Sequence, residues 1–310
     1  MLHQPSQVKN TVTKVLVTGG SGFIGSHLVK HLRSKGYEVF APPSHAVNCL
    51  EAVSVNQFFS AVDLYGESCC VVHTAVGTGG NRVSKPTLET LSDTLMMYQN
   101  IQRAAEAYDV KLINFCSGAA FDRSDSIDNI KETAIESRYP KQHDFYGLAK
   151  NLIARNILDK AHEIGGVLNL RLFGCFGEGE PRHRLISSLL LNPAPTVDAP
   201  EKRMSFFYVK DVARVVEHMI PLVGQPGVPV DINLCYSGSD NRLTLGDIAA
   251  RVSYLTGMPV ATFKRNSLPT PYTGDGNRLQ QLDIPLVGFE AGLREMITEM
   301  EPITGKKLVK

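Results

Sequence analysis

The sequence has no apolar run long enough to cross a membrane and no excess of charge of either sign. A membrane span needs roughly 18 or more consecutive apolar residues, and no window approaches that. The 32 Lys and Arg residues balance 31 Asp and Glu residues, and no basic run suggests a nucleic-acid or anionic-lipid surface. Residues 1–13 are polar and lack the apolar stretch of a signal peptide, which predicts a disordered lead. We therefore expect a cytoplasmic protein that binds neither nucleic acid nor membrane.

The cysteines and histidines lack the spacing of a metal site. None of the six cysteines forms a CxxC pair, and the nine histidines are scattered. Most of the cysteines lie inside apolar runs, which predicts buried free thiols and suits a reducing compartment. We expect no bound metal.

Short apolar runs alternate with longer amphipathic stretches along the first half of the chain. Alternation of this kind is typical of parallel βαβ units and predicts an α/β fold with a doubly wound parallel Rossmann sheet. The expected strands are residues 14–18, 38–41, 70–75, 112–117 and 167–172, and the expected helices are residues 22–35, 53–61, 88–108 and 146–164.

The pattern becomes less regular after about Gly174, where Pro and Gly cluster and the elements are short. We expect residues 14–174 to form a dinucleotide-binding Rossmann domain that carries the catalytic residues. Residues 175–310 are expected to form mainly a smaller α/β substrate-binding lobe, with some elements returning to the first domain.

Glycines recur every three residues in the turn after the first strand, at Gly19, Gly22 and Gly25. The first permits a tight turn, the second lets the backbone approach a pyrophosphate, and the third allows close packing of helix on strand. The free N–H groups at the start of the following helix attract phosphate. The turn therefore predicts a dinucleotide cofactor.

The end of the second expected strand carries no acidic residue that would bind an adenine ribose. A 2′-phosphate is thus not repelled there, and Ser44, His45 or Arg33 could contact it. This favours NADP over NAD.

Tyr146 and Lys150 are spaced to lie on one face of a helix, one turn apart. An ammonium group near a phenol favours the tyrosinate, which makes the pair a proton donor and acceptor. Ser117 ends an expected strand on the same ligand-binding edge of the sheet, so we expect these three residues to be catalytic.

Several segments together resemble the extended short-chain dehydrogenase/reductase family, which comprises NAD(P)-dependent nucleotide-sugar epimerases, dehydratases and reductases. The similar segments are the glycine turn, Cys116–Phe121, Tyr146–Lys150, Arg171–Gly177 and Phe207–Ala213. The resemblance implies further cofactor contacts at Phe23, Ile24, Ala75, Tyr146 and Lys150. It implies substrate contacts at Gly77, Ser117, Gly118, Tyr146, Arg171, His183 and Arg203.

The residues after Ser117 bear on the reaction. Dehydratases of this family place an acidic pair there, whereas this chain has Gly118 and Ala119. The chain instead resembles the GDP-fucose-synthase branch, which implies NADPH-dependent reduction of a nucleotide-linked 4-keto-6-deoxy sugar. Ala119 replaces that branch's epimerase cysteine, and His183 lies near its histidine. An NAD-dependent 4-epimerase and a non-catalytic dinucleotide sensor stay open as alternatives.

The family commonly dimerises through two helices, here near residues 88–108 and 146–164, which implies a homodimer. The apolar stripe formed by Leu91, Leu95, Tyr98 and Ile101 allows this but could equally pack on the sheet. Gly174 and Arg203 depart from the family's substrate-contact pattern, so the base and the sugar stay unassigned.

Overall fold

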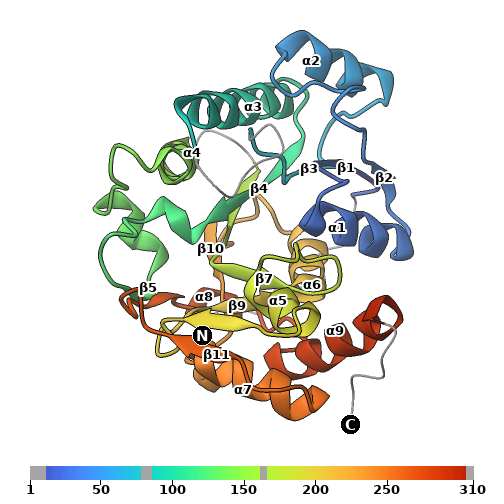
Figure 1. Cartoon of the computed structure of the whole chain (residues 1–310). Coiled ribbons are helices and arrows are strands. Elements are labelled where there is room, and N and C mark those ends of the chain that lie inside the picture. The colour runs from blue at the N-terminus through green and yellow to red at the C-terminus, as the bar shows by residue number, and fades with distance from the viewer. Residues whose placement is uncertain (1–11, 78–85, 161–165, 305–310) are drawn as a thin grey trace.

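The computed structural model describes residues 12–77, 86–160 and 166–304, and a six-stranded parallel sheet lies at its centre (Figure 1). The strand order is β10–β6–β4–β3–β1–β2, and every neighbouring pair is parallel. The predicted doubly wound α/β fold is confirmed. The strands are β1 (Lys14–Thr18), β2 (Glu38–Phe40), β3 (Cys69–His73), β4 (Lys111–Ser117), β6 (Val167–Leu172) and β10 (Asp231–Leu234).

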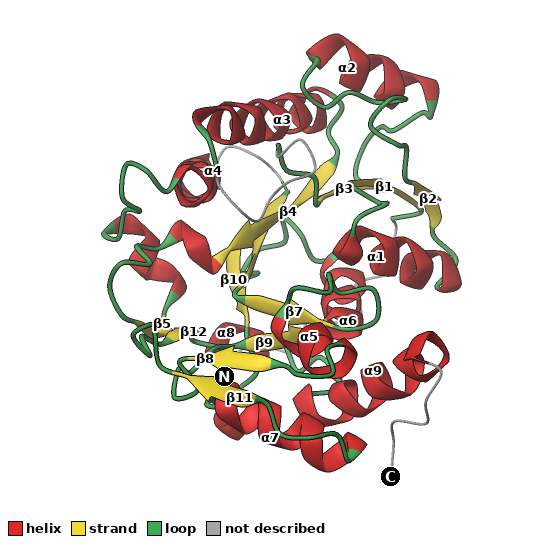
Figure 2. Cartoon of the chain, viewed as in Figure 1, coloured by secondary structure: helices red, strands yellow, loops and turns green. Residues whose placement is uncertain are grey.

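Helices cover both faces of this sheet (Figure 2). The helices α2 (Ala52–Ala61), α3 (Leu88–Ala107) and α4 (Phe145–Lys160) pack side by side on one face. The helices α1 (Phe23–Ser34) and α6 (Val209–Met219) pack against each other on the opposite face. This two-sided cover is why the strands read as continuous apolar runs rather than as alternating patterns.

Three two-stranded parallel ribbons lie beside the carboxyl ends of the sheet strands. They are β7 (Gly174–Phe176) with β9 (Phe206–Tyr208), β8 (Thr196–Asp198) with β11 (Thr262–Lys264), and β5 (Ile127–Ile130) with β12 (Tyr272–Gly274). The helices of this region are α5 (Leu185–Leu191), α7 (Leu245–Thr256), α8 (Asn277–Gln280) and α9 (Phe289–Thr304), and short 3₁₀ turns are η1 (Gly118–Ala120), η2 (Glu132–Glu136) and η3 (Gly238–Asn241). The β5–β12 ribbon joins segments from the two halves of the sequence directly beside the site.

The apolar strands explain where the core lies. Val15, Leu16 and Val17 of β1 are fully buried between the two helical layers. All six cysteines are buried and free, which confirms the expected buried thiols. Among the described residues, no helix is long and apolar enough to cross a membrane.

Val12 and Thr13, the first two described residues, lie beside β1. Val12 is buried, and the N–H of Thr13 donates to the carbonyl of Ser68 at 2.9 Å. These two residues, which the sequence analysis placed in the lead, therefore pack against the sheet. Residues 1–11 lie outside the described residues, as do the last residues of the helix expected to reach 164.

Candidate active site

The glycine turn brings the ends of β1 and β3 into close contact. Gly19 has a φ of +70°, a conformation that side-chain-bearing residues rarely adopt. A Cβ atom on Gly19 would lie 2.8 Å from Thr74 Oγ1 and 2.9 Å from the backbone nitrogen of Ala75. Ala75 therefore lies against the turn, as expected for a cofactor-contact position.

The start of α1 is open for a phosphate group. Gly22 caps the helix without a side-chain hydrogen bond, and the first turn carries no acidic residue. A Cβ atom on Gly25 would overlap the carbonyl oxygen of Gly19. Because only glycine fits there, the turn stays tight, and the N–H of Gly22 donates to the carbonyl of Gly19 at 2.9 Å. The N–H groups of Phe23 and Ile24, in the first turn of the helix, have no intrahelical acceptor, so this cradle fits a pyrophosphate.

The end of β2 presents polar residues and no carboxylate. Ser44 and His45 are both exposed beyond Pro43. Arg33 lies nearby, but its guanidinium donates to the carbonyl of Val39 at 3.1 Å. Ser44 and His45 are thus more available than Arg33 to bind a phosphate on the adenine ribose.

Ser117 ends β4 as predicted, and a tyrosine from the far end of the chain meets it. Ser117 Oγ accepts a hydrogen bond from the N–H of Ala119 at 3.2 Å, and the Tyr272 side chain lies close to it. Burial raises the pKa of Tyr272 well above its ordinary value, so this phenol stays neutral. The turn that follows β4 therefore orients the Ser117 hydroxyl.

Tyr146 and Lys150 lie one turn apart in α4, as the spacing predicts. Asp144 starts the helix by accepting the N–H of Gly147 at 3.0 Å. The buried Lys150 ammonium donates to the carbonyl of Phe115 at 2.7 Å and lies 6.0 Å from the centre of the Tyr146 ring. Lys150 is therefore fixed beneath Tyr146 at the edge of the sheet.

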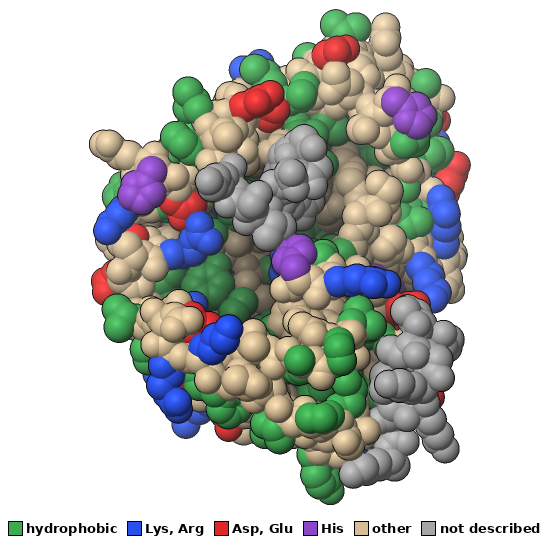
Figure 3. Space-filling model, viewed as in Figure 1, with side chains coloured by type: hydrophobic (Ala, Val, Ile, Leu, Met, Phe, Trp, Pro, Cys, Tyr) green, Lys and Arg blue, Asp and Glu red, His purple; other side chains and the backbone are tan. Residues whose placement is uncertain are grey.

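Ser117 and Tyr146 open into one cavity of about 600 Å³, called here the main cavity. Its apolar wall includes Phe173, Met204 and Phe206, and its polar lining includes Arg123, Glu180, His183, Arg184 and Lys202. Figure 3 shows a hollow on the face in view, with Lys and Arg side chains at its rim. A cavity of this size suits a small organic ligand.

Two positively charged groups of the main cavity lie close to each other. The pKa of Lys202 is lowered by burial and by the charge of Arg123. Arg123 is itself held by Asp144, with N–O distances of 3.0 and 2.7 Å. A ligand anion near Lys202 would relieve this repulsion.

Among the residues expected to contact substrate, His183 lines the main cavity together with Ser117 and Tyr146. Gly118 is buried beside the main cavity. A Cβ atom on Gly118 would lie 2.8 Å from the hydroxyl of Tyr272. Gly77 packs instead against α3, where a Cβ would lie 2.8 Å from the Thr94 nitrogen.

Arg171 lies in the core and does not line the main cavity. Its side chain is fully buried and pairs with Asp231 at 2.7 Å and with Asn233 at 3.0 Å. Its guanidinium also lies 4.8 Å from the centre of the Phe121 ring. Through these contacts Arg171 joins β6 to β10. This residue therefore has a structural role in place of the expected substrate contact.

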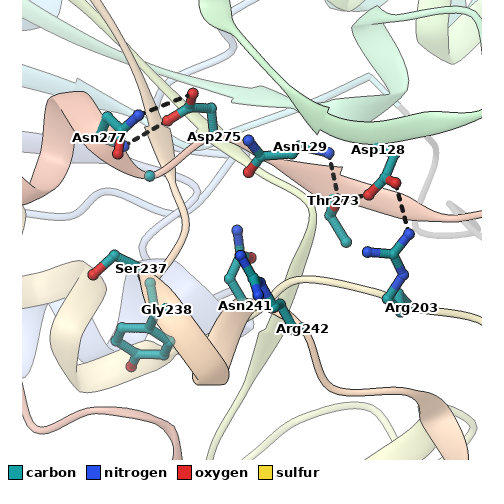
Figure 4. A pocket seen from close by; sticks show the side chains of 12 residues that line it. Asp128, Asn129, Arg203, Ser237, Gly238, Asn241, Arg242, Thr273, Asp275 and Asn277 are labelled. Carbon is teal, nitrogen blue, oxygen red and sulfur yellow. Dashed lines mark hydrogen bonds and ion pairs between the residues drawn. The ribbon is translucent and has the colours of Figure 1, made fainter.

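Arg203 also lies outside the main cavity and pairs with Asp128 at 2.6 Å. It borders a second, polar cavity of about 390 Å³ behind the β5–β12 ribbon, shown in Figure 4. There Thr273 donates to Asp128 at 3.2 Å. Successive residues of a strand point to opposite faces, so Tyr272 faces the main cavity while Thr273 faces this one.

The sequence analysis did not identify several residues of the main cavity. Tyr272 lies 155 residues from Ser117, and Arg123 and Lys202 belong to loops without a recognisable motif. Their placement follows from the β5–β12 ribbon and from the loop before β9, which no local pattern reveals. No group of three or more His, Cys, Asp or Glu side chains in the described part of the chain could hold a metal ion.

The model of the NAD-dependent epimerase/dehydratase family matches residues 15–235, from β1 through the end of β10. The chain belongs to this family. The matched range includes the glycine turn, Ser117, Tyr146 and Lys150, and leaves out Tyr272.

Two curated relatives are similar in sequence. GDP-L-colitose synthase of Yersinia pseudotuberculosis is 21% identical over 226 residues, which cover 67% of this chain and 72% of the relative. ADP-L-glycero-D-manno-heptose-6-epimerase of Cupriavidus pinatubonensis is 24% identical over 198 residues. That second alignment covers 57% of this chain and 55% of the relative's length.

Several solved structures share the fold over nearly the whole chain. The GDP-mannoheptose C4 reductase of Campylobacter jejuni with NADP superimposes with a TM-score of 0.76 at 18% identity, covering 92% of this chain and 97% of that one. A GDP-L-fucose synthetase of Naegleria fowleri bound to NADP gives 0.76 at 17%, covering 98% and 97%. The UDP-glucose 4-epimerase of Thermotoga maritima gives 0.76 at 20%, covering 95% and 100%. At these identities the similarity establishes the shared fold.

Proposed function

We propose that this protein is an NADPH-dependent reductase of a nucleotide-linked 4-keto sugar. The main support is that Ser117 and Tyr146 open into one cavity while Lys150 lies beneath Tyr146. The cradle at Gly19, Gly22 and Gly25 fits a dinucleotide, which when bound supplies a hydride to the keto carbon.

Each side chain at the site has its own role in the proposed reduction. Ser117 hydrogen-bonds the keto oxygen and orients it, while Tyr146 donates the proton that the oxygen takes up on reduction. Tyr272 lies close to Ser117 and, as a neutral phenol, can hydrogen-bond its hydroxyl. Lys150 binds the nicotinamide ribose and stabilises negative charge that develops on the Tyr146 oxygen.

The residues after Ser117 support reduction over dehydration. Gly118 and Ala119 are buried and offer no acid–base group to remove water from the sugar. Phe173 and Tyr272 fill the space that a side chain at position 118 would need. The chemistry supported at this site is hydride and proton exchange at one carbon.

Charge in the main cavity supports a nucleotide-activated substrate. Arg123, Arg184 and Lys202 line it, and guanidinium and ammonium groups are the usual partners of phosphate oxygens. The repulsion between Lys202 and Arg123 would be relieved by a diphosphate. The non-acidic, exposed Ser44 and His45 favour NADP.

The test is NADPH oxidation with a panel of 4-keto sugars linked to GDP, UDP, dTDP or ADP. We expect one of them to oxidise NADPH at a rate that depends on sugar concentration. If the protein binds NADPH but turns over none of them, the proposal fails.

The second candidate is an NAD-dependent 4-epimerase, which the same three residues would also serve. Such an enzyme keeps NAD through purification and needs no external reductant. Mass spectrometry of the dinucleotide that co-purifies separates the two functions, because the reductase proposal predicts exchangeable NADP(H). Presence of Ser117, Tyr146 and Lys150 together argues against a third function, non-catalytic dinucleotide sensing.

A homodimer through α3 and α4 is part of the proposal. The stripe of Tyr98 and Ile101 is buried against the sheet and is not the interface. The outer faces of the two helices instead expose Met96 and Leu152, each 47% accessible. These two side chains are the ones that a second copy would cover.

A further inference from the structure

Glu180 is a buried carboxyl group in the wall of the main cavity that the proposed reaction does not use. The residue follows β7 and is 5% exposed. Its Oε2 atom accepts two hydrogen bonds of 3.0 Å, from the N–H and the hydroxyl of Ser187 in α5. One carboxylate oxygen is therefore fixed by the start of a helix.

The other oxygen, Oε1, is buried and has no hydrogen-bond partner among the described residues. A buried acceptor without a donor is unfavourable, so native structures rarely keep one without a reason. The other side-chain atoms in the same condition belong to Thr94, Asn114, Arg171 and Glu299, none of which lines the main cavity. Glu180 thus combines an unused acceptor with a place in the ligand cavity.

The loop that carries Glu180 is fastened to the cofactor side of the site. The carbonyl of Glu178 is hydrogen-bonded to His27 of α1 at 2.8 Å. A Cβ on Gly179 would lie 3.9 Å from Phe23, next to the glycine turn. This anchoring holds the carboxyl group in place before a ligand arrives, which lowers the ordering cost of binding.

We propose that Glu180 is a specificity-determining residue whose Oε1 accepts a hydrogen bond from a hydroxyl group of the substrate's sugar. The inference rests on the proposed function, because it needs a polyhydroxylated sugar in the main cavity. It adds a recognition role to the loop after β7, separate from the proton transfer by Tyr146. A sugar that lacks the hydroxyl at this position leaves Oε1 unpaired and binds more weakly.

Binding of the sugar at Glu180 should depend on pH. Burial raises the pKa of Glu180 to about 7, against the lowering effect of the Ser187 hydrogen bonds and the Arg184 charge. A sugar hydroxyl at Oε1 is a further donor, so binding lowers this pKa and releases a proton. The affinity for the sugar substrate is then highest above pH 7. It falls as the pH drops below 7, by up to about tenfold per pH unit.

The other titratable or charged groups near Glu180 come from its own segment, from β7 and from across the cavity. They are His183 and Arg184, Cys175 of β7, and Lys202. Burial raises the pKa of the Cys175 thiol far above neutrality, and Arg184 keeps its charge. His183 is the remaining ionisable neighbour in the cavity lining, so the test includes a His183 variant.

The experiment measures binding of GDP-mannose, UDP-glucose and dTDP-glucose to the full-length protein by calorimetry between pH 6 and 8. We expect the sugar nucleotide that binds to bind at least fivefold tighter at pH 8 than at pH 6, with proton release near pH 7. Glu180→Gln should remove the pH dependence and weaken binding at pH 8 by about tenfold. NADPH affinity and the thermal midpoint serve as measures of intact folding.

Two variants are the controls. Glu178→Gln removes a charge from the same loop outside the cavity lining, and His183→Asn removes the nearby imidazole. Both should keep the pH dependence. If Glu180→Gln keeps it, or if His183→Asn alone abolishes it, the role of Glu180 is refuted while the proposed function stands. If wild-type protein binds none of the three sugar nucleotides, the inference about Glu180 fails, while the proposed function is judged separately by NADPH oxidation with the 4-keto sugars.

Discussion

Tyr146 is half-buried at the wall of the main cavity, and Lys150 has its ammonium 6.0 Å from the centre of that ring. A positioned proton donor contributes roughly 10²–10⁴-fold to the rate of a reaction of this kind. Tyr146→Phe removes the transferable proton and keeps the ring. We expect kcat to fall by about 10²–10⁴-fold with NADPH affinity nearly unchanged.

The control for this variant is Tyr139→Phe. Tyr139 is 54% exposed and stacks under Arg155 outside the main cavity, so its hydroxyl should not affect turnover. Steady-state kinetics and fluorescence titration with NADPH measure both effects. Full activity of Tyr146→Phe would remove Tyr146 from the mechanism.

Arg171 illustrates a residue that a motif locates correctly but cannot assign to a role. The segment from Arg171 to Gly177 predicts a functional position, whereas the side chain is fully buried against Asp231 and Asn233. Removing one partner of a buried ion pair leaves the other charge uncompensated. We expect Arg171→Met to lower the free energy of unfolding by about 3–5 kcal/mol.

Urea unfolding measures this loss, with Arg294→Met as the control. Arg294 is 52% exposed and pairs with Glu290 one helical turn away, an arrangement that contributes about 0.3–0.5 kcal/mol. A normally stable Arg171→Met protein with a raised KM for substrate would show that Arg171 contacts the ligand.

Among the elements, the glycine turn and the strands that follow it were predictable because their constraints are local. The apolar runs of β1, β3 and β4 need no knowledge of their neighbours. In contrast, the strand β10 has the sequence Asp-Ile-Asn-Leu, which does not resemble a buried strand. It is stable in the core because Asn169 and Arg171 of β6 satisfy Asp231 with hydrogen bonds of 2.9 and 2.7 Å.

The same distinction holds at the site. Ser117, Tyr146 and Lys150 are placed by one strand and one helix, and sequence spacing sufficed to predict their positions on these elements. Tyr272 reaches Ser117 only because β12 pairs with β5, and that pairing is a long-range contact. Tertiary pairings of this kind leave no periodic signal in the sequence.

The turn at the start of α1 provides a test of the cofactor cradle. Alanine at position 25 would place a Cβ atom against the carbonyl oxygen of Gly19, so the backbone must shift. Loss of a charge-assisted hydrogen bond to phosphate weakens binding by about 10–100-fold. We expect this loss of NADPH affinity in Gly25→Ala.

Ser26→Ala is the matched control, because the exposed Ser26 hydroxyl donates only to the carbonyl of Phe23 in its own helix. It should bind NADPH normally. Isothermal titration of both variants measures the effect, and normal affinity in Gly25→Ala would refute the assignment of this turn to the pyrophosphate.

For the whole molecule, the exposed apolar residues Met96 and Leu152 on the outer faces of α3 and α4 predict a homodimer. Light scattering should give about twice the chain mass of 33.9 kDa. Leu152→Glu should give a monomer, because it places a charge in the contact. Tyr254→Glu, at a residue that is 78% exposed on α7, should stay dimeric. A monomeric wild-type protein at micromolar concentration would contradict this interface.

The overall arrangement places the glycine turn, the Ser117–Tyr146–Lys150 set and the main cavity at the same edge of one sheet. Ligands of open α/β sheets bind at this carboxyl edge. We propose that hydride passes there from NADPH to C4 of a nucleotide-linked keto sugar.

The most direct test uses NADPH that carries deuterium at the transferred position of the nicotinamide, with the 4-keto sugar that supports turnover. Mass spectrometry and NMR of the product locate the label. We expect one deuterium on the sugar C4 for each NADPH oxidised. A product without deuterium, or a sugar inverted at C4 without consumption of NADPH, would contradict it.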